Sequence, residues 1–282
     1  MKISAYRTML FTLGLGSSTL AACGVTDADP ATAGDVADLR ADIRDDLAAT
    51  GRRHAPAAEV LLVHGAWADG SSWSKVIEHL QRERFTVHAV QLCEQSLADD
   101  VALVRAAIAA LPGPLIVAGH SYGGAVISGA SLGQRNVSGL VFVAAFAPEA
   151  GESLGSLSAM FAATQLGPHL VFDAQGAATI DEAGIRDAFA PDVSPAEAGV
   201  LFATQHPFAG AIFGEPAGAP GWATLPSYYA VSRLDRTIAP ELERFLAGRM
   251  HATTIELPAS HVSLISHPRE IAALIERAAI AR

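Results

Sequence analysis

The sequence predicts an α/β protein with a mostly parallel central sheet, helices on both faces and a small inserted helical lid. After Pro56, short continuous apolar runs alternate with longer helical stretches, which is the pattern of strand–helix–strand units. This alternation stops between Pro148 and Pro226, where glycine and proline are frequent, and then resumes. Half of the 282 residues are hydrophobic and only 17% are charged, which excludes a disordered chain. We therefore expect one globular domain that carries an insertion.

The expected elements can be placed in order along this domain. Aliphatic or aromatic runs predict strands at 60–63, 85–92, 115–118, 140–143, 228–232 and 253–257. Apolar residues at helical spacing predict helices at 72–84, 96–111, 240–249 and 268–279, and weaker ones inside the lid at 154–165 and 195–205. The helix at 96–111 is the best defined, because Ser96 suits its N-cap and Asp99 is placed to complete its first turn.

The charge balance limits the classes of partner. The formal net charge is −10, so the chain lacks the basic surface that nucleic-acid binding requires. Cys93 is the one cysteine of the expected domain, which excludes an internal disulfide, and a lone cysteine of this kind is usually buried. The histidines are scattered and form no metal-binding motif. We expect no metal, no other cofactor and no nucleic-acid partner.

The first residues resemble an export signal. Lys2 and Arg7 precede an uncharged run at 8–22, whose 15 residues are fewer than the roughly 20 that a spanning helix needs. The run ends in Leu-Ala-Ala-Cys-Gly, which resembles a bacterial lipobox with Cys23 as the lipidated residue. The alternative is an ordinary secretory signal. We therefore expect export, as a lipoprotein anchored to a membrane surface or as a periplasmic or secreted protein.

These assignments divide the chain into three parts. Residues 1–22 are the expected signal peptide, and residues 23–58 are an Ala/Asp-rich tether. Residues 59–282 are the expected domain, with its lid at about 148–226. The sequence does not indicate an oligomeric state.

The segment Gly119-His120-Ser121-Tyr122-Gly123 matches the pattern G-x-S-x-G. The pattern alone is weak, but here it follows an expected strand and opens an apolar helical stretch at 125–131. A serine on such a tight strand-to-helix turn is exposed at the end of the sheet, near a helix N-terminus that favours negative charge. Ser121 is therefore the candidate nucleophile.

A serine hydroxyl needs a base to take its proton. His261 follows the strand at 253–257 after a short loop, and Asp235 comes directly after the strand at 228–232. The other downstream histidines lie in the lid, before a strand or at the start of the last helix, while Glu241 and Glu243 lie too far into the helix that follows Asp235. Asp235 is expected to hold the His261 imidazole in its productive tautomer.

Acyl transfer also needs donors for the developing oxyanion. The backbone N–H of Tyr122, directly after the candidate nucleophile, is the first expected donor. The loop after the first strand, His64-Gly65-Ala66-Trp67, supplies the second, which we assign to the N–H of Ala66. His64 is expected to be structural.

From about Glu59 onward, these motifs and their order resemble the α/β-hydrolase superfamily, in particular its small-lid esterase branch, which also contains plant hydroxynitrile lyases. The resemblance implies Ser121, Asp235 and His261 as the catalytic triad. This chain has Gly65 where those lyases carry a hydroxyl residue and Val262 where they carry a lysine, so cyanohydrin cleavage is disfavoured.

The sequence thus favours a serine hydrolase that cleaves small to medium carboxylic esters through an acyl-enzyme intermediate. The alternatives are a non-hydrolytic enzyme of the same fold, either a lyase or a cofactor-independent oxygenase or haloperoxidase, and a ligand-binding module with slow turnover. A small ester is the expected substrate, and amides, lactones and thioesters would use the same machinery. Aromatic residues of the domain and lid are expected to line the pocket: Trp67, Phe146, Phe161, Phe202, Phe208, Phe213 and Trp222.

Overall fold

A sheet of six parallel strands forms the centre of the fold. The computed structural model describes residues 59–281, and the strand order is β2-β1-β3-β4-β8-β9. The strands are β1 (Glu59–Val63), β2 (Thr86–Val90), β3 (Leu115–His120), β4 (Val137–Val143), β8 (Ser227–Ser232) and β9 (Thr253–Leu257). Each neighbouring pair is parallel. The predicted fold class is confirmed, and all six strands have their carboxyl ends at one edge of the sheet.

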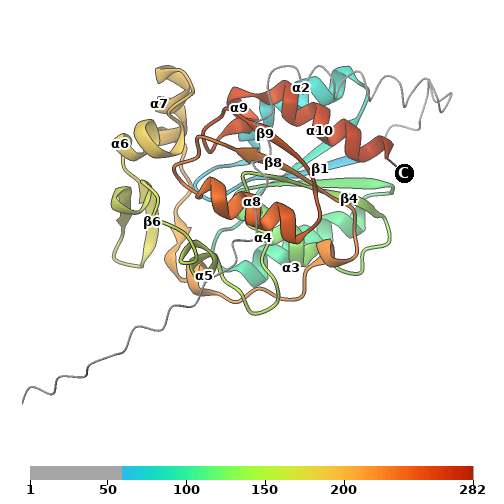
Figure 1. Cartoon of the computed structure of the whole chain (residues 1–282), viewed down its shortest axis with the longest axis horizontal. Coiled ribbons are helices and arrows are strands. Elements are labelled where there is room, and N and C mark those ends of the chain that lie inside the picture. The colour runs from blue at the N-terminus through green and yellow to red at the C-terminus, as the bar shows by residue number, and fades with distance from the viewer. Residues whose placement is uncertain (1–58, 282) are drawn as a thin grey trace, which may run out of the picture. The chain divides into compact units, whose positions relative to one another are not determined.

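Helices cover both faces of the sheet. In Figure 1, α2 (Ser74–Arg82) and α10 (Pro268–Ile280) lie on one side, and α3 (Leu97–Ala110), α4 (Tyr122–Ala130) and α8 (Pro240–Arg249) lie on the other. The central strands are almost wholly buried, whereas β2 and β9 at the sheet edges keep exposed residues. This double coverage explains why the central strands read as continuous apolar runs rather than as alternating ones.

Several element boundaries fall where the sequence predicts them. Both α8 and β9 begin and end at the expected residues. The Ser96 hydroxyl caps α3 by accepting the backbone N–H of Asp99 at 3.1 Å. The helix expected at 72–84 is shorter, because the chain first makes a single 3-10 turn, η1 (Gly70–Trp73), whose N-cap is Asp69.

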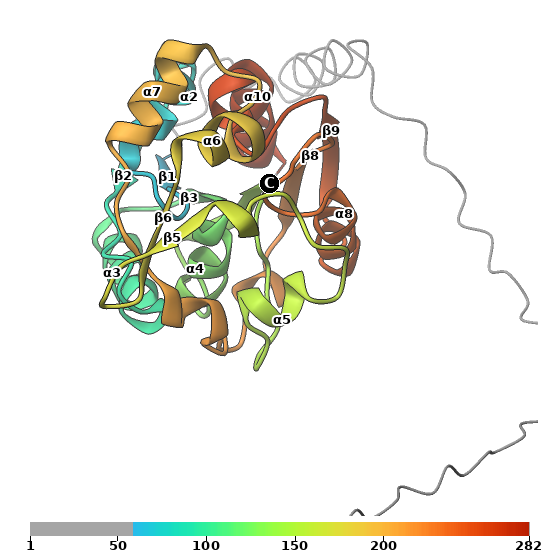
Figure 2. The ribbon, with the colours of Figure 1, turned by 90° about the vertical axis from the view of Figure 1, so that its left-hand side faces the viewer.

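The segment between β4 and β8, which we call the insert (residues 148–226), contains a small sheet as well as helices. Figure 2 places these elements toward the viewer, in front of the carboxyl edge of the main sheet. Three antiparallel strands, β5 (Leu170–Phe172), β6 (Ala177–Ile180) and β7 (Phe208–Ala209), form this second sheet. These strands are not predicted from the sequence, because each has only two to four residues and no regular alternation.

The helices of the insert agree only partly with the two helices predicted for it. Helix α7 (Pro195–Ala203) matches its prediction, and α6 (Glu182–Gly184) is a single turn. Helix α5 (Leu154–Ser158) ends earlier than expected. The chain beyond it is drawn instead to the loop after β8: the backbone N–H of Gln165 donates to the carbonyl of Arg236 at 3.0 Å.

The structure also bears on the cysteines and on the possibility of a membrane-spanning helix. Cys93 is exposed rather than buried, because its neighbours Leu92 and Glu94 are the residues that turn inward. Cys23, the expected signal peptide and the expected tether lie outside the described residues. Within residues 59–281, the longest helices are too short or too polar to cross a bilayer.

Candidate active site

Ser121 occupies a strained turn between β3 and α4. Its backbone has φ 53° and ψ −121°, a conformation that residues with a Cβ rarely adopt. Three backbone hydrogen bonds hold it there: the N–H of Ser121 donates to Val143, and its carbonyl accepts from Gly124 and Phe146, all at 3.0–3.1 Å. The side chain is therefore fixed at the carboxyl edge of the sheet, beside the N-terminus of α4.

Glycines allow the loop after β1 to pass directly over this turn. A Cβ on Gly65 would lie 2.7 Å from the Cβ of Ser121, and a Cβ on Gly123 would lie 2.5 Å from the carbonyl oxygen of His64. Both distances are shorter than van der Waals contact permits. The absence of a side chain at these two positions brings the His64–Trp67 loop against the serine.

Asp235 and His261, predicted from the ends of two different strands, form a buried pair. The Nδ1 of His261 lies 2.6 Å from Oδ2 of Asp235, and neither side chain is exposed. The other carboxylate oxygen of Asp235 accepts the backbone N–H groups of Thr237 at 2.6 Å and Ile238 at 3.0 Å. Because Nδ1 donates to Asp235, the lone pair of the neutral ring is on Nε2, which has no hydrogen-bond partner within the described residues.

Contacts from the insert and from β3 hold His261 in place. Asp192 of the insert accepts both the backbone N–H of Ser260 at 2.8 Å and its hydroxyl. The centroid of the Phe189 ring lies 5.2 Å from the centroid of the His261 imidazole. On the other side, Nε2 of His120 donates to the carbonyl of His261 at 2.9 Å. Burial lowers the pKa of His120 well below its usual value, so this donor is a neutral imidazole.

Glu243, which is not predicted to be the acid, is a close neighbour of Asp235. It lies in the first turn of α8 and is fully buried, and its Oε2 accepts the backbone N–H of Ser232 at 2.9 Å. Burial, and then the negative charge of Asp235, raise the pKa of Glu243 well above its usual value. Glu243 is therefore a neutral carboxylic acid that leaves the negative charge on Asp235.

Two backbone N–H groups are free beside Ser121. Within the described residues, neither Ala66 nor Tyr122 has an acceptor for its backbone N–H. The N–H of Trp67, in contrast, is paired and donates to Oε2 of Glu94 at 3.4 Å. The two donors predicted for an oxyanion are thus unpaired, one on the loop after β1 and one at the start of α4.

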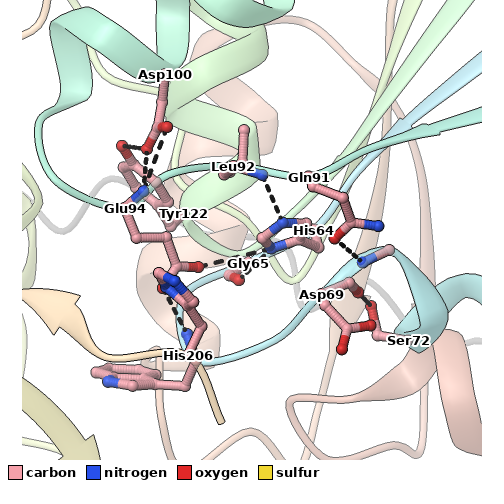
Figure 3. Close-up of polar contacts among 12 residues, drawn as sticks. His64, Gly65, Asp69, Ser72, Gln91, Leu92, Glu94, Asp100, Tyr122 and His206 are labelled. Carbon is pink, nitrogen blue, oxygen red and sulfur yellow. Dashed lines mark hydrogen bonds and ion pairs between the residues drawn. The ribbon is translucent and has the colours of Figure 1, made fainter. Parts of the chain in front are cut away.

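His64 has the structural contacts expected of it. Its Nε2 accepts the backbone N–H of Leu92 at 2.9 Å, and its Nδ1 donates to the carbonyl of Gly65 at 2.9 Å. Figure 3 shows the ring between these two backbone segments. Burial lowers the pKa of His64, which keeps the ring neutral. The ring therefore ties the first loop to the segment after β2.

The predicted pocket residues separate into two groups. The ring of Trp67 packs on three phenylalanine rings, with centroid distances of 5.6 Å to Phe208, 6.3 Å to Phe213 and 6.2 Å to Phe189. Of these three, Phe189 is not predicted from the sequence. The backbone of Phe146 contacts Ser121. The remaining three lie elsewhere: Phe161 packs on Phe245, Phe202 is exposed on α7, and Trp222 donates its indole N–H to Pro148. The sequence alone does not separate these three residues from the first group, because only the tertiary packing differs between them.

A cavity of about 300 Å³ lies between α7 and the η1–α2 segment. Its lining includes Trp67, Lys75, Val200, Leu201 and Ile265, and no residue of the Ser121–Asp235–His261 set. Lys75 and Glu197 both line it, with Nζ of Lys75 2.5 Å from Oε1 of Glu197. Within residues 59–281, no three His, Cys, Asp or Glu side chains are placed to hold a metal ion.

Comparison with known proteins identifies the family. The sequence profile of the alpha/beta hydrolase family matches residues 60–274, about three quarters of the chain. The chain belongs to the alpha/beta hydrolase family. A search of curated protein sequences gave no significant match.

Solved structures of other alpha/beta hydrolases superpose on this one over most of their length. Polyneuridine aldehyde esterase is 16% identical, with a TM-score of 0.67 over 77% of this chain and 97% of its own. An extracellular hydrolase from a Paenibacillus species is 20% identical (TM-score 0.66; 78% and 98% covered). A pyrethroid hydrolase from Sphingobium faniae is 22% identical (TM-score 0.67; 79% and 98% covered). At these identities the likeness shows the fold.

Proposed function

We propose that this alpha/beta hydrolase is a serine esterase that cleaves small to medium carboxylic esters. One observation carries the proposal: a buried His261–Asp235 hydrogen bond of 2.6 Å at the sheet edge where Ser121 occupies its strained turn. The names of two of the superposed proteins, polyneuridine aldehyde esterase and a pyrethroid hydrolase, support the same reaction class.

The proposed reaction has two half-steps. In the first, the Oγ of Ser121 attacks the ester carbonyl carbon while Nε2 of His261 takes the hydroxyl proton, and the alcohol leaves with that proton. In the second, His261 takes a proton from water, the hydroxide attacks the acyl-enzyme, and the acid is released as the proton returns to Ser121. The N–H groups of Ala66 and Tyr122 stabilise the oxyanion in both, and each donor is worth roughly 3 kcal/mol of barrier.

Active-site labelling tests the proposal directly. A fluorophosphonate probe is expected to label the protein once, on the peptide that contains Ser121, because only an activated serine reacts with it. The protein should also hydrolyse p-nitrophenyl acetate and butyrate. Mass spectrometry of the labelled digest and initial rates give the two readouts. Absence of both labelling and hydrolysis would contradict the proposal.

The aromatic group around Trp67 is proposed to limit the acyl chain. Phe213→Ala removes a ring whose centroid lies 5.3 Å from that of the Phe208 ring. The substitution should open space beside the His64–Trp67 loop. We expect the ratio of kcat/KM for p-nitrophenyl hexanoate to that for the acetate to rise about tenfold. Phe161→Ala is the matched control, because that ring packs on α8 instead. An equal shift in both variants would refute this pocket assignment.

A further inference from the structure

Glu94, in the segment between β2 and α3, combines two unfavourable features. Its side chain has no exposed surface, although an ionisable carboxyl is among the groups least often buried. Its backbone has φ 55°, which is left-handed and strained for a residue with a side chain. Such a residue persists only where its surroundings require it. Figure 3 shows its carboxyl directed toward His64 and His206.

The carboxyl of Glu94 contacts the loop that carries one free N–H. Oε2 accepts the backbone N–H of Trp67 at 3.4 Å, and Oε1 lies 3.6 Å from Nδ1 of His64. Trp67 itself has φ 62°. These contacts lie on both sides of Ala66, whose own N–H is unpaired. Oε1 of Glu94 has no hydrogen-bond partner within the described residues, so its approach to His64 is a contact and not a hydrogen bond.

The backbone of Glu94 is linked to the second free N–H. Asp100 on α3 accepts the backbone N–H of Glu94 at 3.2 Å and that of Cys93 at 2.8 Å. The same carboxylate accepts the phenol hydroxyl of Tyr122 at 2.8 Å. Tyr122 contributes the other unpaired N–H, so one short hydrogen-bonded chain connects both donors.

The insert is attached at the same point. The carbonyl of Glu94 accepts the backbone N–H of Ala209 in β7 at 3.0 Å, and Nδ1 of His206 lies 3.5 Å from Oε2 of Glu94. Glu94 thus joins the first loop, the start of α3 and the insert through one residue.

We propose that Glu94 is a positioning residue of the oxyanion hole, which fixes the loop carrying the Ala66 N–H relative to Tyr122 and to the insert. The inference rests on the proposed esterase function. Glu94 touches no reacting atom; it acts through Trp67 and His64.

The protonation state of Glu94 supports this role. Burial, and then the negative charge of Asp100, raise the pKa of Glu94 to about 9. The groups facing it are His64 from the first loop, Asp100 from α3, Tyr122 from α4 and His206 from the insert. At neutral pH the carboxyl is uncharged, and above about pH 9 its ionisation would place a negative charge next to the site where the oxyanion forms.

Three variants of the full-length protein test the inference: Glu94→Leu, Glu94→Gln and, as a matched surface control, Glu83→Gln. We expect Glu94→Leu to lower kcat for p-nitrophenyl acetate by about 10- to 100-fold with KM changed less than about threefold, since outright loss of an oxyanion donor costs about 10²- to 10³-fold. Glu94→Gln keeps a hydrogen-bonding side chain and should restore most of kcat at pH 7. The wild-type kcat should fall above about pH 9, and this alkaline loss should be absent from Glu94→Gln and present in Glu83→Gln.

Thermal unfolding of each variant confirms that it is folded, and the pH profile of Glu94→Gln carries the test if Glu94→Leu does not fold. An unchanged kcat in Glu94→Leu, or the same alkaline loss in Glu94→Gln as in wild type, would overturn the inference. Failure of the esterase function would look different: the wild type itself would show no Ser121-dependent hydrolysis.

Discussion

Replacing Ser121 by alanine is expected to lower kcat for p-nitrophenyl butyrate by about 10⁶-fold, because removal of the nucleophile of a Ser-His-Asp triad costs about that much. In the proposed mechanism the Oγ of Ser121 is the protein atom that bonds to the acyl group. The substitution removes one buried oxygen and leaves the backbone turn intact, so folding should be preserved. Initial rates, fluorophosphonate labelling and thermal unfolding measure the outcome.

Ser128→Ala is the matched control for this loss. Ser128 lies on the same helix, α4, and is equally buried, and its hydroxyl donates to the carbonyl of Gly124 at 2.8 Å. Its removal should leave kcat within about threefold of wild type, with full labelling. Residual activity of Ser121→Ala above about one percent, measured on protein free of wild-type contamination, would mean that another group is the nucleophile.

Asp235→Asn is expected to lower kcat by about 10⁴-fold with little effect on stability. The asparagine can still accept the N–H groups of Thr237 and Ile238 on its carbonyl oxygen, which preserves the loop. Its amide nitrogen would face Nδ1 of His261 as a donor, so the ring would carry its proton on Nε2. That tautomer cannot take a proton from Ser121.

The control for the acid is Asp173→Asn, because Asp173 is an exposed carboxylate that, like Asp235, accepts backbone N–H groups of its own turn. Asp173 accepts the backbone N–H of Ala177 at 2.8 Å in the β5–β6 turn. Its kcat should stay within about twofold of wild type. If Asp235→Asn lowered kcat by less than about tenfold, with unchanged thermal unfolding, Asp235 would not orient the base.

The sequence located Asp235 and His261 because both follow strands of one parallel sheet. The carboxyl ends of such strands share an edge, so two residues far apart in the chain can be expected to meet there. The same reasoning located Ser121 and the Ala66 loop. The long strands and helices were predictable for a related reason: their apolar patterns are local and extend over many residues.

Glu243, Phe189 and Glu94 were not predictable by that reasoning. Glu243 reads as an ordinary acidic residue in the first turn of a helix, and only the crossing of α8 over β8 buries it beside Asp235. Phe189 lies in a segment without periodicity, and its contact with His261 depends on how the insert folds back. Glu94 reads as a polar loop residue. None of the three has a local sequence signal that singles it out: Glu243 lies well inside the helix after Asp235, with Glu241 between them.

Lysine occurs at positions 2 and 75 alone, and Lys75 lies where the insert meets α2, bonded to Glu197 and to the carbonyl of Ile265 at 3.2 Å. Within residues 59–281, an amine-reactive dye or resin therefore has a single side chain to attack. Coupling there would break the Lys75–Glu197 ion pair and attach the label at the rim of the 300 Å³ cavity. A preparation coupled through Lys75 would present this junction to the support, and a dye at the same position would report movement of α7 relative to α2.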